Sequence, residues 1–446
     1  MMRRVFLLVA GLTLAAIALV LARGVGVPEA ELRILAAPEH RVLEPVLTDW
    51  GASTGVTITI DYALPHRIAD EIGRGEDGRY DAVWPDHALW IELGDRERIV
   101  RHRTSTHRSP IVLALRRGVA EELGWLGQRD IPLEEIVAAI ESGGVRAAMS
   151  SATQTGPGAA AFFGLLHALA GSPAIIAPGD LEDAELRARL GSLLARLGPS
   201  AGDAAWLMEV AAGDQERIDA VWTTEALMIA ANRRLSEAGA ETFYAIYPAE
   251  GLALADSPLG YLHRGDEARR EAFLALRDHL LARSAQIRML AAGRRAGPPG
   301  RPPGQPDPGV WNRAWGVDVS RSFEPVPTPA AEVIADALAL YQAELRKPSL
   351  TVWVLDVSGS MEGAPLEELK DAMALRLDPE AGAVDLLQPT ARDVTIVIPF
   401  NHQTGEPWRV DGAEPGALAG LRERIEGLEA GGGTDIYAAV GRAMLL

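Results

Sequence analysis

Three oxygen-bearing side chains are spaced two residues apart in a short turn near the C-terminal end of the sequence. Asp356, Ser358 and Ser360 come directly after the apolar run 350–355, and Gly359 lets the turn close. One carboxylate and two hydroxyls on a tight turn can converge on one point, and such hard donors suit Mg²⁺, Mn²⁺ or Ca²⁺. The alternative is a plain turn that caps the next helix, because Asp and Ser favour both. We interpret the motif as a metal site.

A second loop, Gly431-Gly432-Gly433-Thr434, offers a further hydroxyl ahead of a predicted helix. Together with the Met361 that follows the first turn, the two loops resemble the metal-ion-dependent adhesion site of a von Willebrand factor A domain. The resemblance implies a Mg²⁺ ion with one coordination position open to a carboxylate of a partner protein. The metal ligands that it implies are Asp356, Ser358, Ser360 and Thr434.

The resemblance covers residues 348–446, about the first half of such a domain. The family's third loop, an Asp after the next strand, would lie beyond Leu446, so we expect a C-terminally incomplete domain. Asp435 could be taken as a substitute ligand, but an acidic residue in a first helical turn more often complements the helix dipole.

Elements that alternate between strand and helix fill the region 31–292. Short apolar runs at 32–36, 56–62 and 80–84 predict strands, and segments with helical spacing separate them. Such alternation is typical of parallel sheets with right-handed crossovers. We expect two α/β lobes, the first from 31–110 with 250–292 and the second from 111–249.

Loops at the strand ends of these lobes are the candidate ligand contacts. Free N–H groups and the positive end of a helix dipole favour oxygen ligands there. The loop 150–156 before a predicted helix is the best candidate; its structural alternative is a capped helix entrance. For Trp84 the alternative is packing inside a lobe. The predicted ligand-binding residues are Ser150, Ser151, Thr153, Thr155, Trp84, Asp86, Thr223 and Thr224.

The whole 28–297 block resembles a bacterial extracellular solute-binding protein of the two-lobe periplasmic type. In related clamshells the loop after the first strand often carries small hydroxyl residues, whereas this chain has Pro38 and Glu39 there, which leaves the ligand class open. The stretches that carry the resemblance are 32–37, 80–84, 109–113, 151–156, 222–226 and 256–260.

A Pro- and Gly-rich stretch at 293–310 interrupts the α/β pattern, and we expect a solvated linker there, including Arg294 and Arg295. The segment 298–347 is accordingly predicted to connect the clamshell to the von Willebrand A domain. The expected fold class is α/β: a clamshell followed by a truncated Rossmann-like domain, with an N-terminal transmembrane helix.

The N-terminus, residues 1–27, predicts export. Two arginines precede the uncharged run 5–22, and Arg23 ends it. A basic flank before an apolar run keeps its positive end in the cytoplasm. The run is long enough for a retained single-pass anchor; the alternative is a signal peptide cleaved after 20–22. In both cases the bulk of the chain lies outside the cytoplasmic membrane, in the periplasm.

Composition excludes several classes of function. There are 43 Lys and Arg against 61 Asp and Glu, a net charge of −18, which disfavours nucleic-acid binding. Cysteine is absent, so disulfides, thiolate metal sites and Cys nucleophiles are excluded. The two Gly-x-Ser-x-Gly sequences, 51–55 and 198–202, follow predicted helices and not strands, so neither is a nucleophile elbow. The sequence also lacks a Walker-type loop and a His-Glu-x-x-His motif, and we predict no enzymatic activity.

Three functions remain open. The leading one is a membrane-tethered binding protein whose clamshell takes a small solute while the von Willebrand A domain makes Mg²⁺-dependent contacts with a protein partner. The second is a plain receptor that delivers solute to an ABC-type permease. The third is an adhesion or scaffold protein with a ligand-free clamshell.

Overall fold

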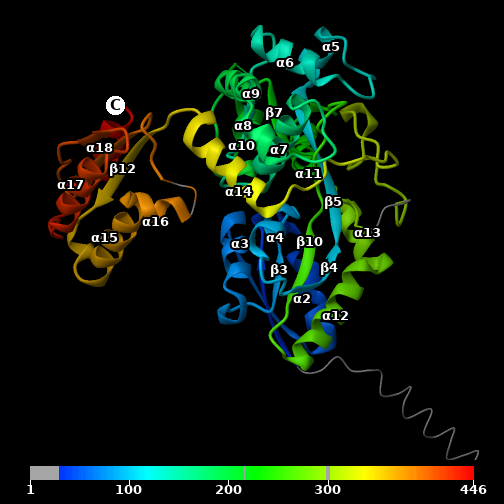
Figure 1. The fold of residues 1–446 in the computed structure, drawn as a ribbon, viewed down its shortest axis with the longest axis horizontal. Coiled ribbons are helices and arrows are strands. Elements are labelled where there is room, and N and C mark those ends of the chain that lie inside the picture. The colour runs from blue at the N-terminus through cyan, green and yellow to red at the C-terminus, as the bar shows by residue number, and fades with distance from the viewer. Residues whose placement is uncertain (1–29, 215, 298–301, 385, 387) are drawn as a thin grey trace, which may run out of the picture.

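The computed structural model describes residues 30–446 except 215, 298–301, 385 and 387 (Figure 1). The apolar run 5–22, predicted as an anchor or signal, lies outside these residues. Within the described part of the chain, no helix is both long and apolar enough to cross a membrane. The chain forms two α/β lobes and a C-terminal α/β unit, which lies to one side of the lobes in Figure 1.

Lobe 1 is built on a five-stranded sheet in the order β2-β1-β3-β10-β4. The strands β1, β2 and β3 are parallel, and β10 runs antiparallel to β3 and β4. Leu32, Ile34 and Ala36 of β1 have no exposed surface and face the helices that cover the sheet. The elements are β1 (Glu31–Ala36), α2 (Glu44–Thr54), β2 (Thr57–Tyr62), α3 (Pro65–Gly73), β3 (Ala82–Trp84), α4 (Leu89–Gly94), β4 (Val100–Ser105), β10 (Pro258–Leu262), α12 (Glu267–Leu281) and α13 (Arg283–Ala291).

Lobe 2 contains a second sheet in the order β11-β5-β7-β6, with β8 and β9 also paired to β5. The long strand β5 is buried along most of its length, as its apolar sequence predicts. The elements are β5 (His107–Arg116), α5 (Arg117–Glu122), α6 (Leu133–Glu141), β6 (Ala147–Met149), α7 (Gly156–Leu169), α8 (Pro178–Glu182), α9 (Ala184–Arg196), α10 (Ala204–Gly213), β7 (Ala220–Thr224), α11 (Glu225–Glu237), β8 (Phe243–Ile246), β9 (Leu254–Ala255) and β11 (Arg295–Ala296).

The chain crosses between the lobes where one strand ends and the next begins. It leaves lobe 1 between β4 and β5, at Thr106, and returns between β9 and β10, at Ser257. The two crossings are tied together, because Thr106 N donates to Ser257 O at 3.2 Å and Thr106 Oγ1 donates to the same oxygen at 2.9 Å. The lobes therefore share a paired hinge, close to the boundary that the sequence predicts.

The segment after β11 packs on lobe 2. Trp311, Trp315 and Val317 join the buried core of that lobe. Trp311 also contacts α13 of lobe 1, since its Nε1 donates to Leu290 O at 2.9 Å. Val310, the last residue of the predicted solvated linker 293–310, is buried in the same core, so that prediction is wrong at this end of the stretch. Pro and Gly favour irregular backbone, but the apolar side chains between them still bury against a neighbouring surface.

The helix α14 (Ala331–Leu340) contacts both lobes: it packs on α4 of lobe 1 and on α8 of lobe 2. Figure 1 shows it in yellow at the level where the lobes meet. A π-helical turn, Tyr341–Leu345, continues it, and Tyr341 packs edge-on against Phe162 of α7 with ring centroids 5.2 Å apart. The buried α14 residues share one core cluster with residues of both lobes; they are Val333, Ile334, Ala337, Leu338 and Leu340.

The C-terminal unit has a three-stranded sheet, β12-β13-β14, with β12 and β13 parallel and β14 antiparallel to β13. Its core lies between this sheet and α15 with α17. Most of β12 is only half-buried, because it is an edge strand and not the fully covered strand that its sequence predicts. The elements are β12 (Leu350–Asp356), α15 (Ala364–Leu377), α16 (Pro379–Val384), β13 (Val394–Phe400), β14 (Trp408–Asp411), α17 (Pro415–Glu426) and α18 (Ile436–Ala443).

Candidate functional site

Two acidic side chains of lobe 1 follow neighbouring parallel strands. Glu39 comes after β1 and Asp86 after β3, and Ala36 and Trp84 at the ends of these strands lie opposite each other. Both residues therefore leave the sheet at its carboxyl edge, where α/β folds place their ligands. The sequence predicts a ligand contact at Asp86 but not at Glu39.

The carboxylate of Asp86 is buried at the boundary between the lobes without a hydrogen-bond partner. The residue is 2% exposed, and neither Oδ1 nor Oδ2 accepts a hydrogen bond. Across the boundary lies Gly156, the first residue of α7 in lobe 2: a Cβ added there would lie 1.6 Å from Asp86 Oδ2. The lobes are thus closed on one another, and burial followed by the charge of Glu39 raises the pKa of Asp86 well above its ordinary value.

Glu39 adds a second carboxylate that lacks a partner at one of its oxygens. Its Oε2 atom is buried and accepts no hydrogen bond, and burial raises the pKa of the group. The nearby Arg294 opposes that shift, but its Nη1 and Nη2 donate to main-chain oxygens, those of Ala292 at 3.2 Å and of Glu39 at 2.5 Å. Asp203 of lobe 2 adds further negative charge near Glu39.

The Trp84 side chain packs inside lobe 1. It is 1% exposed, and its ring stacks on His40 with centroids 4.2 Å apart. Its Nε1 donates to Thr106 Oγ1 at 2.9 Å, which links it to the hinge. Burial lowers the pKa of His40 to about 3, so this ring is neutral and can stack without a desolvation penalty for charge.

The hydroxyl loop before α7 is folded onto itself. Ser150 Oγ lies 2.7 Å from Thr155 Oγ1, and Ser151 Oγ lies 3.1 Å from Thr153 Oγ1. Thr155 also caps α7 by accepting from Gly158 N at 3.0 Å. These contacts match the capped helix entrance that the sequence left as the alternative, and ligand contact by the four hydroxyls stays a prediction.

The two threonines after β7 differ from each other. Thr224 caps α11 by accepting from Leu227 N at 3.3 Å. Thr223 has no exposed surface, and its Oγ1 has no hydrogen-bond partner. Like the loop before α7, they stand at a helix entrance in lobe 2, and ligand contact by either stays a prediction.

A buried ion pair that sequence reasoning missed joins the connecting segment to lobe 2. Arg295 donates to Glu225 through Nε at 2.7 Å and Nη2 at 2.8 Å, and the Glu225 side chain has no exposed surface. Tyr247 donates its hydroxyl to the same carboxylate. The expectation of solvated arginines at Arg294 and Arg295 is therefore wrong, since both are buried. An acidic residue at a helix start and a distant arginine give no signal in sequence that they will meet.

Comparison with known proteins decides the family. The family model described as "Bacterial extracellular solute-binding protein" matches residues 32–295, which is more than half of the chain. The chain belongs to this family. The match ends before the C-terminal unit, and a search of the curated proteins finds no match. As a solute-binding protein the chain is extracytoplasmic and takes a small solute, and the prediction that it is not an enzyme is confirmed.

Solved structures share the fold of this solute-binding protein. The periplasmic binding protein AfuA from Actinobacillus pleuropneumoniae, solved with exogenous fructose-6-phosphate, is similar with a TM-score of 0.53 and 9% identity over 71% of this chain and 99% of that chain. The periplasmic binding protein P5PA is similar with a TM-score of 0.51 and 9% identity over 71% of this chain and 100% of that one. At these identities the likeness shows the α/β periplasmic-binding-protein fold alone, which confirms the expected clamshell.

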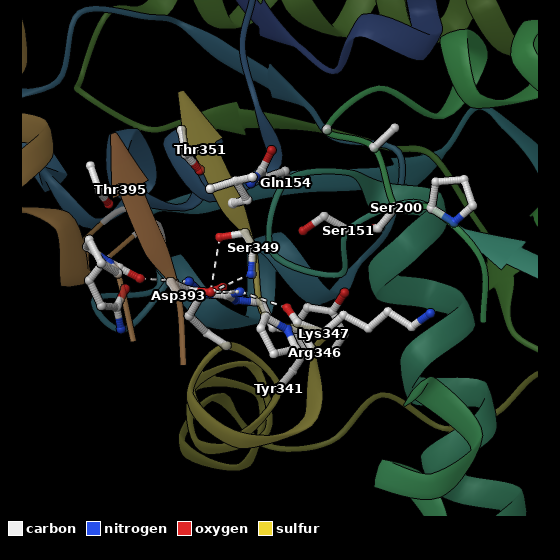
Figure 2. Close-up of a pocket in the computed structure, with 18 of the residues that line it drawn as sticks. Ser151, Gln154, Ser200, Tyr341, Arg346, Lys347, Ser349, Thr351, Asp393 and Thr395 are labelled. Atoms are coloured by element: carbon white, nitrogen blue, oxygen red, sulfur yellow. Dashed lines mark hydrogen bonds and ion pairs between the residues drawn. The ribbon is translucent and has the colours of Figure 1, made fainter. Parts of the chain in front are cut away.

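A cavity of about 530 Å³ lies between lobe 2 and the C-terminal unit of the solute-binding protein (Figure 2). Ser151 and Gln154 line it from lobe 2, and Arg346, Ser349 and Asp393 line it from the other side. Burial alone would raise the pKa of Asp393. However, the hydrogen bonds from Arg346 and from the main chain hold it well below its usual range. Arg346 Nη1 donates to Asp393 Oδ1 at 2.9 Å, so this pair fastens the wall of the cavity.

The two loops that resemble an adhesion site are adjacent in the structure. Gly359 N donates to Gly432 O at 3.0 Å, and Gly431 N donates to Val357 O at 2.9 Å. Within the first loop, Ser358 Oγ lies 3.2 Å from Ser360 Oγ, and Asp356 Oδ1 accepts from Ser358 N at 2.7 Å.

The donor set at these loops is one carboxylate with hydroxyls. Thr434, in the second loop, is exposed. Asp435 caps α18 through Ala438 N at 3.1 Å, the role that the sequence favours for it. Among the described residues, no three His, Cys, Asp or Glu side chains gather closely enough to hold a metal ion. A metal at Asp356 would therefore depend on the hydroxyl oxygens of Ser358 and Ser360.

Proposed function

We propose that the protein is the substrate-binding receptor of an ABC-type permease and that its solute binds between the lobes. The observation that carries this is the meeting of Asp86 with Gly156: the carboxyl edge of the lobe 1 sheet faces the first turn of α7 in lobe 2. Two-lobe proteins bind ligands where strand ends and helix starts face each other. A solute held there would contact both lobes and so favour their closure.

Thermal unfolding of the full-length chain tests the proposal. A panel of sugars, oxyanions, amines, amino acids and metal ions would be screened for an upward shift of the unfolding midpoint. A ligand at a hundredfold excess over its Kd stabilises the native state by about 2.7 kcal/mol. A shift with one chemical class supports the receptor function, whereas a flat panel contradicts it and favours a scaffold with a ligand-free clamshell.

Lobe closure gives a second readout that does not depend on stability. The chain has no native cysteine, so two introduced thiols can be labelled selectively. Glu76→Cys on lobe 1 and Glu135→Cys on lobe 2 are both at exposed positions. Energy transfer between dyes on this pair should change when a solute of the active class is added. A control pair within lobe 1, Glu76→Cys with Glu267→Cys, should not respond.

For the C-terminal unit, we propose a von Willebrand A-like role in binding a protein partner in a Mg²⁺-dependent manner. The close approach of the hydroxyls of Ser358 and Ser360 beside Asp356, with the loop of Thr434 adjacent, supports it. These oxygens suit Mg²⁺, which would offer an electrophilic position to a partner's carboxylate. The membrane tether through residues 1–27 is proposed on the sequence alone.

Mutation of one donor tests this second role. Ser358→Ala removes a 1%-exposed hydroxyl, whereas Ser320→Ala removes a hydroxyl from the connecting segment and serves as the control. Isothermal titration of Mg²⁺ into the full-length chain should give binding for the wild type and for Ser320→Ala, and none for Ser358→Ala. Equal binding by all three proteins would contradict the metal site.

A further inference from the structure

We infer that the solute carries a small organic cation, an ammonium group, which binds between the carboxylates of Glu39 and Asp86. This inference rests on the proposed function, because it names the chemical class of the solute at the same boundary between the lobes. It starts from two carboxylates on one sheet edge, of which Asp86 lacks a hydrogen-bond partner at both side-chain oxygens and Glu39 at Oε2.

Burial of Asp86 without a partner is the first step. A carboxylate taken out of water is costly unless a hydrogen bond or an opposite charge compensates it. Asp86 is 2% exposed and both of its side-chain oxygens lack a partner. In closed lobes without solute, the group therefore has an unsatisfied requirement for donors, which a cation between the lobes would meet.

The surrounding charge is the second step. Glu39 lies close enough to raise the pKa of Asp86, and Asp256 acts in the same direction. Asp203 approaches Glu39 from lobe 2. Arg294 is a cationic neighbour of Glu39, and its guanidinium donates to main-chain oxygens of Ala292 and Glu39. Arg108 lies near Asp256. Carboxyl groups outnumber the guanidinium beside them, and a bound cation would stabilise their ionised forms, although the boundary lies at the start of a helix, where an anion would otherwise be favoured.

The chemistry of the donors distinguishes an ammonium group from the other classes. An oxyanion would be repelled by the carboxylates, and Thr155 already occupies the N–H of Gly158 in the first turn of α7. A hard metal ion takes about six oxygen ligands, and the described residues offer no group of three acidic or imidazole ligands. An ammonium group has three donors, which two carboxylates and one further oxygen can accept.

The contact with Gly156 also defines how the solute enters. Asp86 occupies the space beside the first turn of α7, since a Cβ at Gly156 would overlap it. A solute is admitted only when the lobes part or the Asp86 side chain turns away from α7. The cation then lies against the Asp86 carboxylate, in the place that the first turn of α7 occupies in the closed structure.

Matched pairs of small molecules test the inference on the full-length chain. Ethanolamine and putrescine carry ammonium groups, and ethylene glycol and 1,4-butanediol are their neutral counterparts. Each amine should bind at least tenfold more tightly than its alcohol and should change the energy transfer between the labelled lobes. Manganese chloride and sodium sulfate serve as the metal and oxyanion probes, and neither should reproduce the effect.

Two neutralising variants assign the site. Asp86→Asn and Glu39→Gln should each weaken amine binding at least tenfold, while raising the unfolding midpoint of the solute-free protein. A carboxylate with a purely structural role would give a lower midpoint instead. Glu92→Gln, an exposed carboxylate on α4 of the same lobe, makes the same charge change and should leave both quantities as in the wild type. Because the two variants are independent, failure of one to fold leaves the other decisive.

The outcomes separate this inference from the proposed function. If sulfate, manganese or a neutral sugar changes the energy transfer between the labelled lobes and the amines do not, the receptor function stands and the cation is wrong. If the amines bind equally well to Asp86→Asn, Glu39→Gln and Glu92→Gln, the site is wrong. If no molecule of any charge binds or changes the energy transfer between the labelled lobes, the solute site between the lobes is itself overturned.

Discussion

The carboxylate of Asp86 and the backbone of Gly156 come from different lobes and lie so close that no side chain fits between them: a Cβ on the glycine would lie 1.6 Å from Oδ2. This contact shows that the two lobes are closed on one another at this point of their boundary. It also explains why a residue without a Cβ stands at the start of α7, where φ imposes no need for glycine.

Gly156→Ala should hold the lobes apart. The added Cβ would overlap a 2%-exposed carboxylate that has little room to turn, and overpacking of this kind costs about 1–3 kcal/mol. Energy transfer between labels at Glu76→Cys and Glu135→Cys should report a more open protein, with weaker solute binding. Gly179→Ala in α8 is the control, because a Cβ there meets nothing within 4 Å. Unchanged closure in Gly156→Ala would refute the contact.

The pH dependence of stability should reveal the charge of Asp86. Its pKa is raised in the folded state, so the folded chain binds this proton more tightly than the unfolded chain. The contribution of Asp86 to stability therefore falls as pH rises from about 4, the ordinary carboxyl pKa, toward the raised pKa. The Asp86→Asn variant lacks this loss, and its advantage over the wild type in the free energy of unfolding should grow across that window.

Denaturant unfolding at stepped pH measures this difference. The neighbouring His40 and His87 act in the opposite sense, because burial lowers the pKa of both, and each contributes stability that is lost as pH falls below about 6.5. They are present in both proteins, so they cancel in the comparison to first order. A constant difference between Asp86→Asn and the wild type across the pH range would contradict the assignment.

The ion pair of Arg295 with Glu225 should be essential for holding the connecting segment against lobe 2. Glu225→Gln leaves the buried guanidinium without its counter-charge, and the expected loss is about 3–5 kcal/mol in the free energy of unfolding. The double variant Glu225→Gln/Arg295→Met should recover part of that loss, since it removes both charges. Asp411→Asn breaks the exposed pair with Arg409 and should leave the denaturation midpoint unchanged. A small effect of Glu225→Gln would show that the pair is not buried in solution.

Removal of buried side-chain volume from α14 should loosen both lobes at once. Leu338 has no exposed surface, and Leu338→Ala should cost about 2–5 kcal/mol. It should also shift the energy transfer of the solute-free protein toward the open value, because α14 packs on both lobes. Leu375→Ala in α15 removes the same volume from a side chain that is 54% exposed, and both readouts should stay near the wild type. If Leu338→Ala lowers stability but leaves the energy transfer between the lobes unchanged, α14 does not contribute to closure.

The sequence predicts the order of strands in the clamshell because the interior strands are apolar runs bounded by turns. It misses β4, whose residues are mostly polar and none of which is fully buried, so neither alternation nor an apolar run identifies it. It also treats the Pro- and Gly-rich stretch as solvated, although Trp311 and Trp315 a little further on are the apolar signal of a packed segment. The Pro and Gly content predicts an irregular backbone there, but it does not predict the surface on which the tryptophans pack.

The candidate site was predictable only in part. Asp86 is a predicted contact because loops after parallel strands converge at one sheet edge. Its approach to Gly156 depends on how the two lobes close, which no local pattern encodes. The same holds for Glu39, which draws attention because its buried Oε2 has no hydrogen-bond partner in the folded chain.

The position of α14 changes what a solute has to achieve. In a clamshell without such a helix, the solute supplies the whole preference for the closed state. Here the chain itself favours the closed state, since the apolar residues of α14 lose packing contacts with one lobe whenever the lobes part. The more strongly α14 favours the closed state without solute, the smaller is the change in the closed population that binding of any one solute can cause. The chain continues from α14 through the π-helical turn into β12, so the unit that carries Ser358 follows directly after the helix that packs on both lobes.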